Sequence, residues 1–103
     1  MESIDTGIFK EFEKYMLDNK YTINVIDEMS IRGIKDTFIV HFYYDWKYYQ
    51  FVIYVSDNGY KLYATMFLQI ENGYQLNFDN DKRVFGDLKD ILQFTSSEIN
   101  RDI

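Results

Sequence analysis

Hydrophobic positions near the start of the chain recur with the period of an α-helix. Ile8, Phe12, Tyr15 and Met16 stand at positions i, i+4, i+7 and i+8, with charged residues between them. Asn19-Lys20 follows the last apolar position and is typical of a helix end. We therefore expect an amphipathic helix over about residues 7–18, with one face in the core.

From residue 21 the period changes from helical to alternating. Tyr21, Ile23 and Val25 alternate with polar residues, which predicts a first strand. The pattern loosens through Arg32-Gly33 and defines no turn between residues 30 and 37.

Two turn signals then predict a meander. A turn at Asp45-Trp46 would pair Phe42 with Tyr49. Asn58-Gly59 suits a type I′ turn, because both of its central positions need positive φ. Both turns select the same inward face. Its members are Phe38, Val40, Phe42, Tyr49, Phe51, Ile53, Leu62 and Met66.

A third hairpin is expected around Glu71-Asn72-Gly73, and it has two interpretations. A two-residue turn would turn Gln75 and Asn77 toward the same inward face. A three-residue loop with Gly73 in the left-handed region would pair Ile70 with Tyr74 and keep the inward face apolar. The second interpretation is favoured on this ground.

A closing helix is expected over residues 84–94, where Leu88, Ile91 and Leu92 lie on one face, followed by a frayed tail. The whole pattern predicts a single α+β domain over residues 1–103. Its expected order is α-β-β-β-β-β-α, with an antiparallel meander sheet of four to five strands. The two terminal helices are expected to pack mainly on one face of the sheet.

The second face of this sheet would be unusually aromatic. It would carry Ile39, His41, Tyr43, Tyr48, Gln50, Val52, Tyr54, Tyr63, Thr65 and Phe67. Such residues either form cross-strand ladders, lie beneath a helix, or bind a partner. Trp46 at a hairpin tip is either a partner anchor or a ring packed on Tyr44 or Tyr48.

Composition narrows the classes of function. Aromatic residues make up 19% of the chain, cysteine is absent, and the net charge is −6. The three segments 1–30, 31–70 and 71–103 have net charges of −4, +1 and −3. This distribution argues against direct nucleic-acid binding, which favours a basic surface, and permits binding to a basic protein. No apolar run suggests a leader or a membrane span, so a cytoplasmic protein is expected.

The sequence contains no pattern typical of an enzyme or a cofactor site. His41 is the only histidine, and without cysteine no thiol nucleophile exists. Residues 79–90 superficially resemble a calcium loop, but Arg83 and Val84 occupy positions that need an oxygen ligand and a glycine. No glycine-rich phosphate loop is present. We expect no catalytic residue, no metal and no cofactor.

Acidic residues form two candidate strips. The first strip consists of Glu11, Glu13 and Asp18 on the first helix, with Asp27 and Glu28 after it. The second consists of Asp79, Asp81, Asp87 and Asp90 around the last turn and helix. Such strips can steer a basic partner or imitate a phosphate backbone. Interleaved lysines such as Lys14 and Lys89 weaken the mimicry.

These observations favour a small, acidic, non-enzymatic protein-binding module. Its composition is typical of phage-encoded antagonists of host defence, which would place it in the host cytoplasm. The expected partner is a protein with a basic surface, such as a nuclease or another nucleic-acid-binding protein. The partner-binding candidates are His41, Tyr43, Trp46, Tyr48, Tyr54, Tyr63 and Phe67, together with the acidic strips. The alternatives are an immunity or antitoxin-like protein, a small-ligand binder, or a homodimer formed through the tyrosine-rich face.

Overall fold

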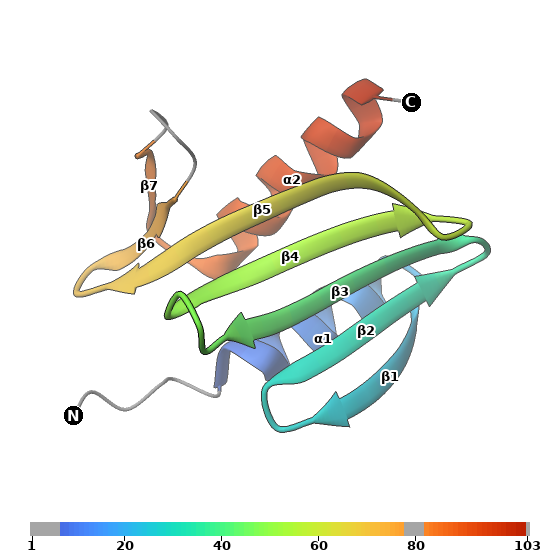
Figure 1. Cartoon of the computed structure of the whole chain (residues 1–103), viewed down its shortest axis with the longest axis horizontal. Coiled ribbons are helices and arrows are strands. Elements are labelled where there is room, and N and C mark those ends of the chain that lie inside the picture. The colour runs from blue at the N-terminus through green and yellow to red at the C-terminus, as the bar shows by residue number, and fades with distance from the viewer. Residues whose placement is uncertain (1–6, 78–81, 103) are drawn as a thin grey trace.

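The computed structural model describes residues 7–77 and 82–102, which form one seven-stranded antiparallel sheet and two helices. In chain order the elements are α1 (Gly7–Asp18), β1 (Thr22–Asp27), β2 (Ser30–Lys35), β3 (Phe38–Asp45), β4 (Gln50–Asp57), β5 (Tyr60–Ile70), β6 (Gly73–Leu76), β7 (Val84–Phe85) and α2 (Leu88–Asp102). Every strand pairs with its neighbours in sequence. Both helices lie behind the sheet in the view of Figure 1, so the sheet has a covered face and an open face.

The predicted α+β class, with an antiparallel meander and helices on one face, is confirmed. The sheet is larger than expected because residues 22–35 form two strands joined by a turn at Glu28-Met29. Val84-Phe85 was expected to begin the closing helix but forms β7 against β6. Helix α2 begins at Leu88 and continues to Asp102, past the point where the tail was expected to fray.

Helix α1 has the predicted face and the predicted end. Ile8, Phe9, Phe12 and Met16 are buried. After Asn19, Lys20 adopts a φ of 71°. The N–H of Lys20 donates to the carbonyl of Leu17, and the N–H of Tyr21 donates to that of Met16. This is a Schellman motif, which satisfies the last helical carbonyls and turns the chain toward β1.

The β3–β4 hairpin turns two residues later than the sequence suggested, so each β3 residue pairs with a residue four positions further along β4. Asp45 pairs with Gln50, so Trp46–Tyr49 forms a four-residue loop and Phe42 faces Ile53. Because the shift is an even number of residues, each paired residue keeps its predicted face. The prediction fails only for Tyr48 and Tyr49, which lie in the loop.

The type I′ turn at Asn58-Gly59 is confirmed by φ values of 53° and 88°. A β-bulge follows immediately. Ser56 pairs with Lys61 but Val55 pairs with Tyr63, which leaves Leu62 as an extra residue in β5. The bulge exchanges the two faces for the rest of the strand.

Leu62 packs against the core as predicted, but the predicted faces of β5 are wrong after it. Thr65 and Phe67 are fully buried on the covered face, whereas Met66, predicted to point inward, lies on the open face. The same exchange explains the next hairpin. Ile70 pairs with Gly73 through a two-residue turn at Glu71-Asn72, and this places Tyr74 and Leu76 in the core. The three-residue loop that we favoured from the sequence is wrong.

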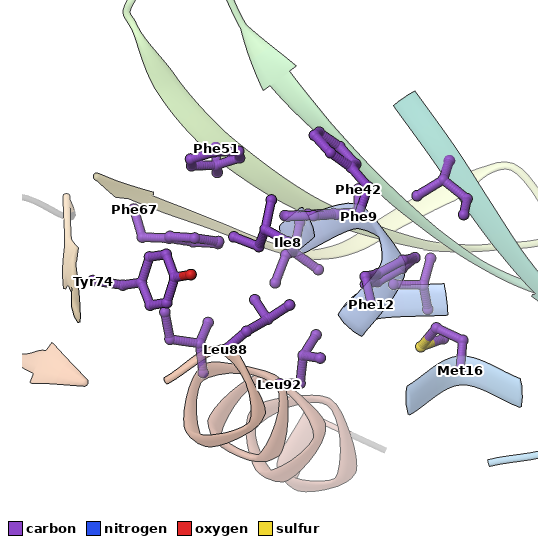
Figure 2. Close-up of a cluster of buried hydrophobic side chains, with 14 of the residues drawn as sticks. Ile8, Phe9, Phe12, Met16, Phe42, Phe51, Phe67, Tyr74, Leu88 and Leu92 are labelled. Atoms are coloured by element: carbon purple, nitrogen blue, oxygen red, sulfur yellow. The ribbon is translucent and has the colours of Figure 1, made fainter. Parts of the chain in front are cut away.

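The core is a row of aromatic rings between the sheet and the helices. Phe42, Phe51 and Phe67 come from three adjacent strands and stack, with ring centroids 5.8 and 5.4 Å apart. Phe9 and Phe12 of α1 each approach Phe42 to 4.9 Å. Figure 2 shows these rings facing Leu88 and Leu92 of α2. Much of the aromatic surplus in the sequence therefore fills the core.

Candidate partner-binding surfaces

The most exposed cluster of aromatic side chains is the β3–β4 loop, Trp46–Tyr49, which we call the aromatic loop. Trp46, Tyr48 and Tyr49 are 59%, 61% and 72% exposed. Asp45, the last residue of β3, stabilises the start of the loop, because its carboxylate accepts a hydrogen bond from the Lys47 N–H at 2.9 Å. Three large rings thus stand in solvent on a short, locally braced loop.

Tyr49 combines exposure with an unfavourable backbone conformation. Its φ is 54°, in the left-handed region that favours glycine and asparagine. A bulky aromatic residue costs about 1 kcal/mol or more there. Its side chain is the most exposed of the three, so little burial offsets this cost. Backbone strain of this kind is frequent in binding and active sites.

Trp46 lies edge-on against Tyr44, with ring centroids 4.8 Å apart. The indole therefore contacts Tyr44, one of the two rings expected beside it, and it stays 59% exposed. The contact orients the indole without burying it, and Lys47 Nζ lies 5.3 Å from the Tyr48 ring. The loop therefore presents a partly fixed aromatic surface.

Acidic side chains surround this loop. In a meander, alternate turns lie at the same end of the sheet, so the β1–β2 and β5–β6 turns stand beside the aromatic loop (Figure 1). Asp27 and Glu28 belong to the first of these turns and Glu71 to the second. Together with Asp45, they outnumber Lys47, the one cation that these turns and the loop contribute. This end of the sheet is aromatic and acidic.

The open face carries a second group of predicted residues. The register brings together Ser30, Arg32, Ile34, Ile39, His41, Tyr43, Val52, Tyr54, Ala64, Met66 and Leu68. His41, Tyr43 and Tyr54 are half-buried there by their neighbours. No described helix covers them.

His41 sits in a polar cluster within this apolar face. Its Nε2 lies 2.7 Å from Ser30 Oγ, and its ring centroid is 4.6 Å from that of Tyr43. Burial, and then the positive charge of Arg32, lower the pKa of His41, and Asp27 opposes this shift. Burial, with Asp45 and Tyr54 nearby, raises the pKa of Tyr43. His41 is therefore held as a neutral imidazole at neutral pH.

Two predicted partner-binding residues lie on the other face. Phe67 is fully buried in the core and Tyr63 packs against the core from the covered side. The bulge at Leu62 is the reason, because it turns both side chains toward the helices. A ligand pocket lined jointly by His41, Tyr54 and Tyr63 is excluded for the same reason.

The helix acids lie on the far side of the molecule from the open face. Glu11 and Asp18 of α1 line a groove of about 340 Å³ together with Asp87, next to Lys14 and Lys89. Glu13 does not line it. The two predicted strips thus meet in part across this groove, but with lysines between their acids. Asp79 and Asp81 lie outside the described residues.

Asp87 also has a structural role. Its Oδ1 accepts a hydrogen bond from the Asp90 N–H at 3.0 Å, which makes it the N-cap of α2. Asp90 then lies in the first helical turn, where negative charge is favourable. The N-cap position of Asp87 and the first-turn position of Asp90 therefore explain both acids, and no binding partner is needed to explain them.

Three residues of these surfaces were not expected there from the sequence: Ser30, Arg32 and Tyr49. The first two could have been found from a two-residue turn at Asp36-Thr37, which sets Arg32 opposite His41. Among the described residues, no three His, Cys, Asp or Glu side chains gather closely enough to hold a metal ion. No helix in the described part of the chain is long and apolar enough to cross a membrane.

Comparisons of the chain with protein-family models, with curated proteins and with solved structures found no match.

Proposed function

We propose that the protein is a small, non-enzymatic binding module that inhibits a nucleic-acid-handling protein by occluding its basic surface. The observation that carries this proposal is the aromatic loop, which exposes Trp46, Tyr48 and Tyr49 in one short segment. Tryptophan and tyrosine dominate the residues that contribute most to protein–protein binding. The expected location of this protein is the cytoplasm of a host cell, where it would meet such a partner.

The charge around the loop supports a basic partner. Asp27, Glu28, Asp45 and Glu71 belong to the same end of the sheet as the loop. Arginine and lysine side chains bind the faces of tryptophan and tyrosine rings, and carboxylates nearby strengthen that attraction. Nucleic-acid-handling proteins present such side chains on their binding surfaces.

The test starts with affinity capture of partners from a lysate treated with nuclease, followed by purification of the captured protein. The purified partner is then mixed with labelled nucleic acid and increasing amounts of this protein. We expect release of the nucleic acid as the complex forms. A partner that keeps its nucleic acid while bound would contradict the occlusion mechanism, and a toxin as partner would favour the immunity-like alternative.

Matched variants locate the contact. Trp46→Ala should weaken binding by about 2 kcal/mol, or roughly 30-fold, if the indole is an anchor. Tyr60→Ala is the control, because Tyr60 is 76% exposed at the opposite end of the sheet. Equal effects of the two variants would place the contact elsewhere.

A further inference from the structure

The open face holds an arginine, Arg32, with one buried donor atom that no described residue pairs. Arg32 is half-buried, and its Nε atom is buried with no hydrogen-bond partner among the described residues. An unpaired buried donor on a charged group is costly, so its presence calls for an explanation. An absent anionic partner is one of the few explanations that also accounts for the surroundings.

Those surroundings suit an anion. Arg32 pairs directly with His41, and His41 pairs with Tyr54 on the next strand. Ser30 and Tyr43 complete the group through their contacts with His41. Because Ser30 and His41 hydrogen-bond to each other, one donor of this pair stays free, and that donor and the Tyr43 phenol can bind an oxyanion beside the guanidinium.

Each of the two nearby carboxylates accepts a backbone hydrogen bond. Asp27 and Asp45 stand at the strand ends that border this cluster. Asp27 Oδ1 accepts the Met29 N–H at 2.8 Å, and Asp45 accepts the Lys47 N–H. Arg32 acts on the pKa of His41 more strongly than Asp27 does.

We propose that Arg32, His41 and Ser30 form a binding site for a carboxylate group carried on an apolar body. A guanidinium is planar and binds a carboxylate through paired hydrogen bonds. With His41 neutral, the cluster offers one positive charge, which matches a carboxylate better than a phosphate dianion. Ile34 and Ile39, which are only partly buried, flank the cluster on the same face and supply apolar contact. This site is separate from the aromatic loop and does not depend on the proposed function.

The experiment is an NMR titration of the folded protein that follows the Arg32 Nε–H and the His41 ring, whose signals are single because the chain has one histidine. Benzoate is the ligand probe, and benzamide is its neutral counterpart of the same shape. Sodium chloride at matched ionic strength controls for screening. We expect saturable shifts and a rise in the His41 pKa with benzoate, and neither effect with benzamide or chloride. Equal responses to benzoate and benzamide would overturn the proposal.

Two variants test the assignment to Arg32. Arg32→Gln should weaken benzoate binding by about tenfold or more, because it removes the charge and the paired donors. Lys61→Gln removes a cation from another strand and should change the affinity by less than about twofold. If Arg32→Gln does not fold, Arg32→Lys keeps the charge without the planar fork and should still weaken binding severalfold. Unchanged benzoate binding in a folded Arg32 variant would overturn the proposal that Arg32 forms this site.

Two further ligands identify the source of the carboxylate. Inorganic phosphate should bind more weakly than benzoate, and tighter phosphate binding would overturn the carboxylate assignment. N-acetylphenylalanine presents the carboxylate of a chain end, whereas benzoate represents a free organic acid. The tighter of the two binders assigns the source, and failure of both to bind would overturn the proposal.

Discussion

At the scale of single residues, Tyr49 is the clearest case of a side chain that the stability of the fold does not favour. Its backbone is in the left-handed region and its side chain is 72% exposed. Asn58 and Gly59 show what the same backbone region normally selects, since both also have positive φ. Neither the backbone conformation nor burial in the fold accounts for a tyrosine in this place.

Tyr49→Gly should therefore stabilise the free protein. Relief of the left-handed strain should raise the free energy of unfolding by about 0.5–1 kcal/mol, after the entropy of the unfolded glycine is subtracted. Tyr48→Gly is the matched control, because Tyr48 does not have positive φ, and it should lower stability slightly. Urea unfolding measures the free energy of unfolding of both variants. A loss of stability in Tyr49→Gly would show that its ring makes contacts worth more than the strain.

The titration of His41 is a second prediction at this scale. Burial and Arg32 lower its pKa below 6.5 in the folded protein, against the opposing charge of Asp27. The stability tied to the neutral ring is therefore fully present above pH 6.5 and is lost as the pH falls toward the folded-state pKa. His41→Gln should remove this part of the pH dependence. Arg32→Gln should raise the His41 pKa, as followed by NMR, and a fall would show that the guanidinium charge does not lower it.

At the scale of elements, the bulge in β5 decides which residues form the core. One extra residue, Leu62, exchanges the faces of the strand and carries the exchange into β6 through a two-residue turn. It brings Phe67 into the aromatic row and leaves Met66 on the open face. The composition of both faces therefore depends on one local irregularity.

Two alanine substitutions distinguish the bulged register from a regular one. Phe67→Ala should cost about 3–5 kcal/mol, because the ring is fully buried in the aromatic core. Met66→Ala should cost only about 1 kcal/mol, because Met66 is half-buried on the open face. Chemical denaturation of both variants gives the comparison. The opposite order of effects would indicate that β5 pairs without the bulge.

The sequence alone predicted the elements better than their register. Asn58-Gly59 was predictable because few residue pairs tolerate positive φ at both positions. The bulge was not, because residues 62–68 are almost entirely apolar or aromatic on both faces, so alternation cannot select between the two registers. The cluster around His41 was half predictable: His41, Tyr43 and Tyr54 share a face as expected. Arg32 and Ser30 required the register of β2, which the loose pattern around Gly33 did not define.

At the scale of the whole molecule, the described carboxylates gather on the helix side and at one end of the sheet. The helix layer carries Glu11, Asp18 and Asp87 around its groove. The central part of the open face has no carboxylate, since Asp27 and Asp45 stand at strand ends. The aromatic loop lies at the acidic end of the sheet. A basic partner that approaches from this end meets attractive charge before it meets the rings.

Binding of a basic partner should therefore depend on salt mainly through its association rate. We expect the association rate constant to fall by about tenfold between roughly 0.05 and 0.5 M NaCl, with a smaller change in dissociation. Glu28→Lys with Glu71→Lys should slow association and reduce the salt dependence. Glu11→Lys on the helix side is the control. An association rate that salt does not affect would contradict the proposal that acidic residues attract a basic partner.

The meander also has a consequence for how the chain folds. Every strand pair joins neighbours in sequence through a short connection, so the sheet can form by successive closure of small loops. Contact between α1 and α2, by contrast, joins segments about seventy residues apart and closes the largest loop. We expect the hairpins to form early and the docking of the two helices to limit the rate. Substitutions at the helix–helix contact should then slow folding more than those in the turns, as stopped-flow kinetics can measure.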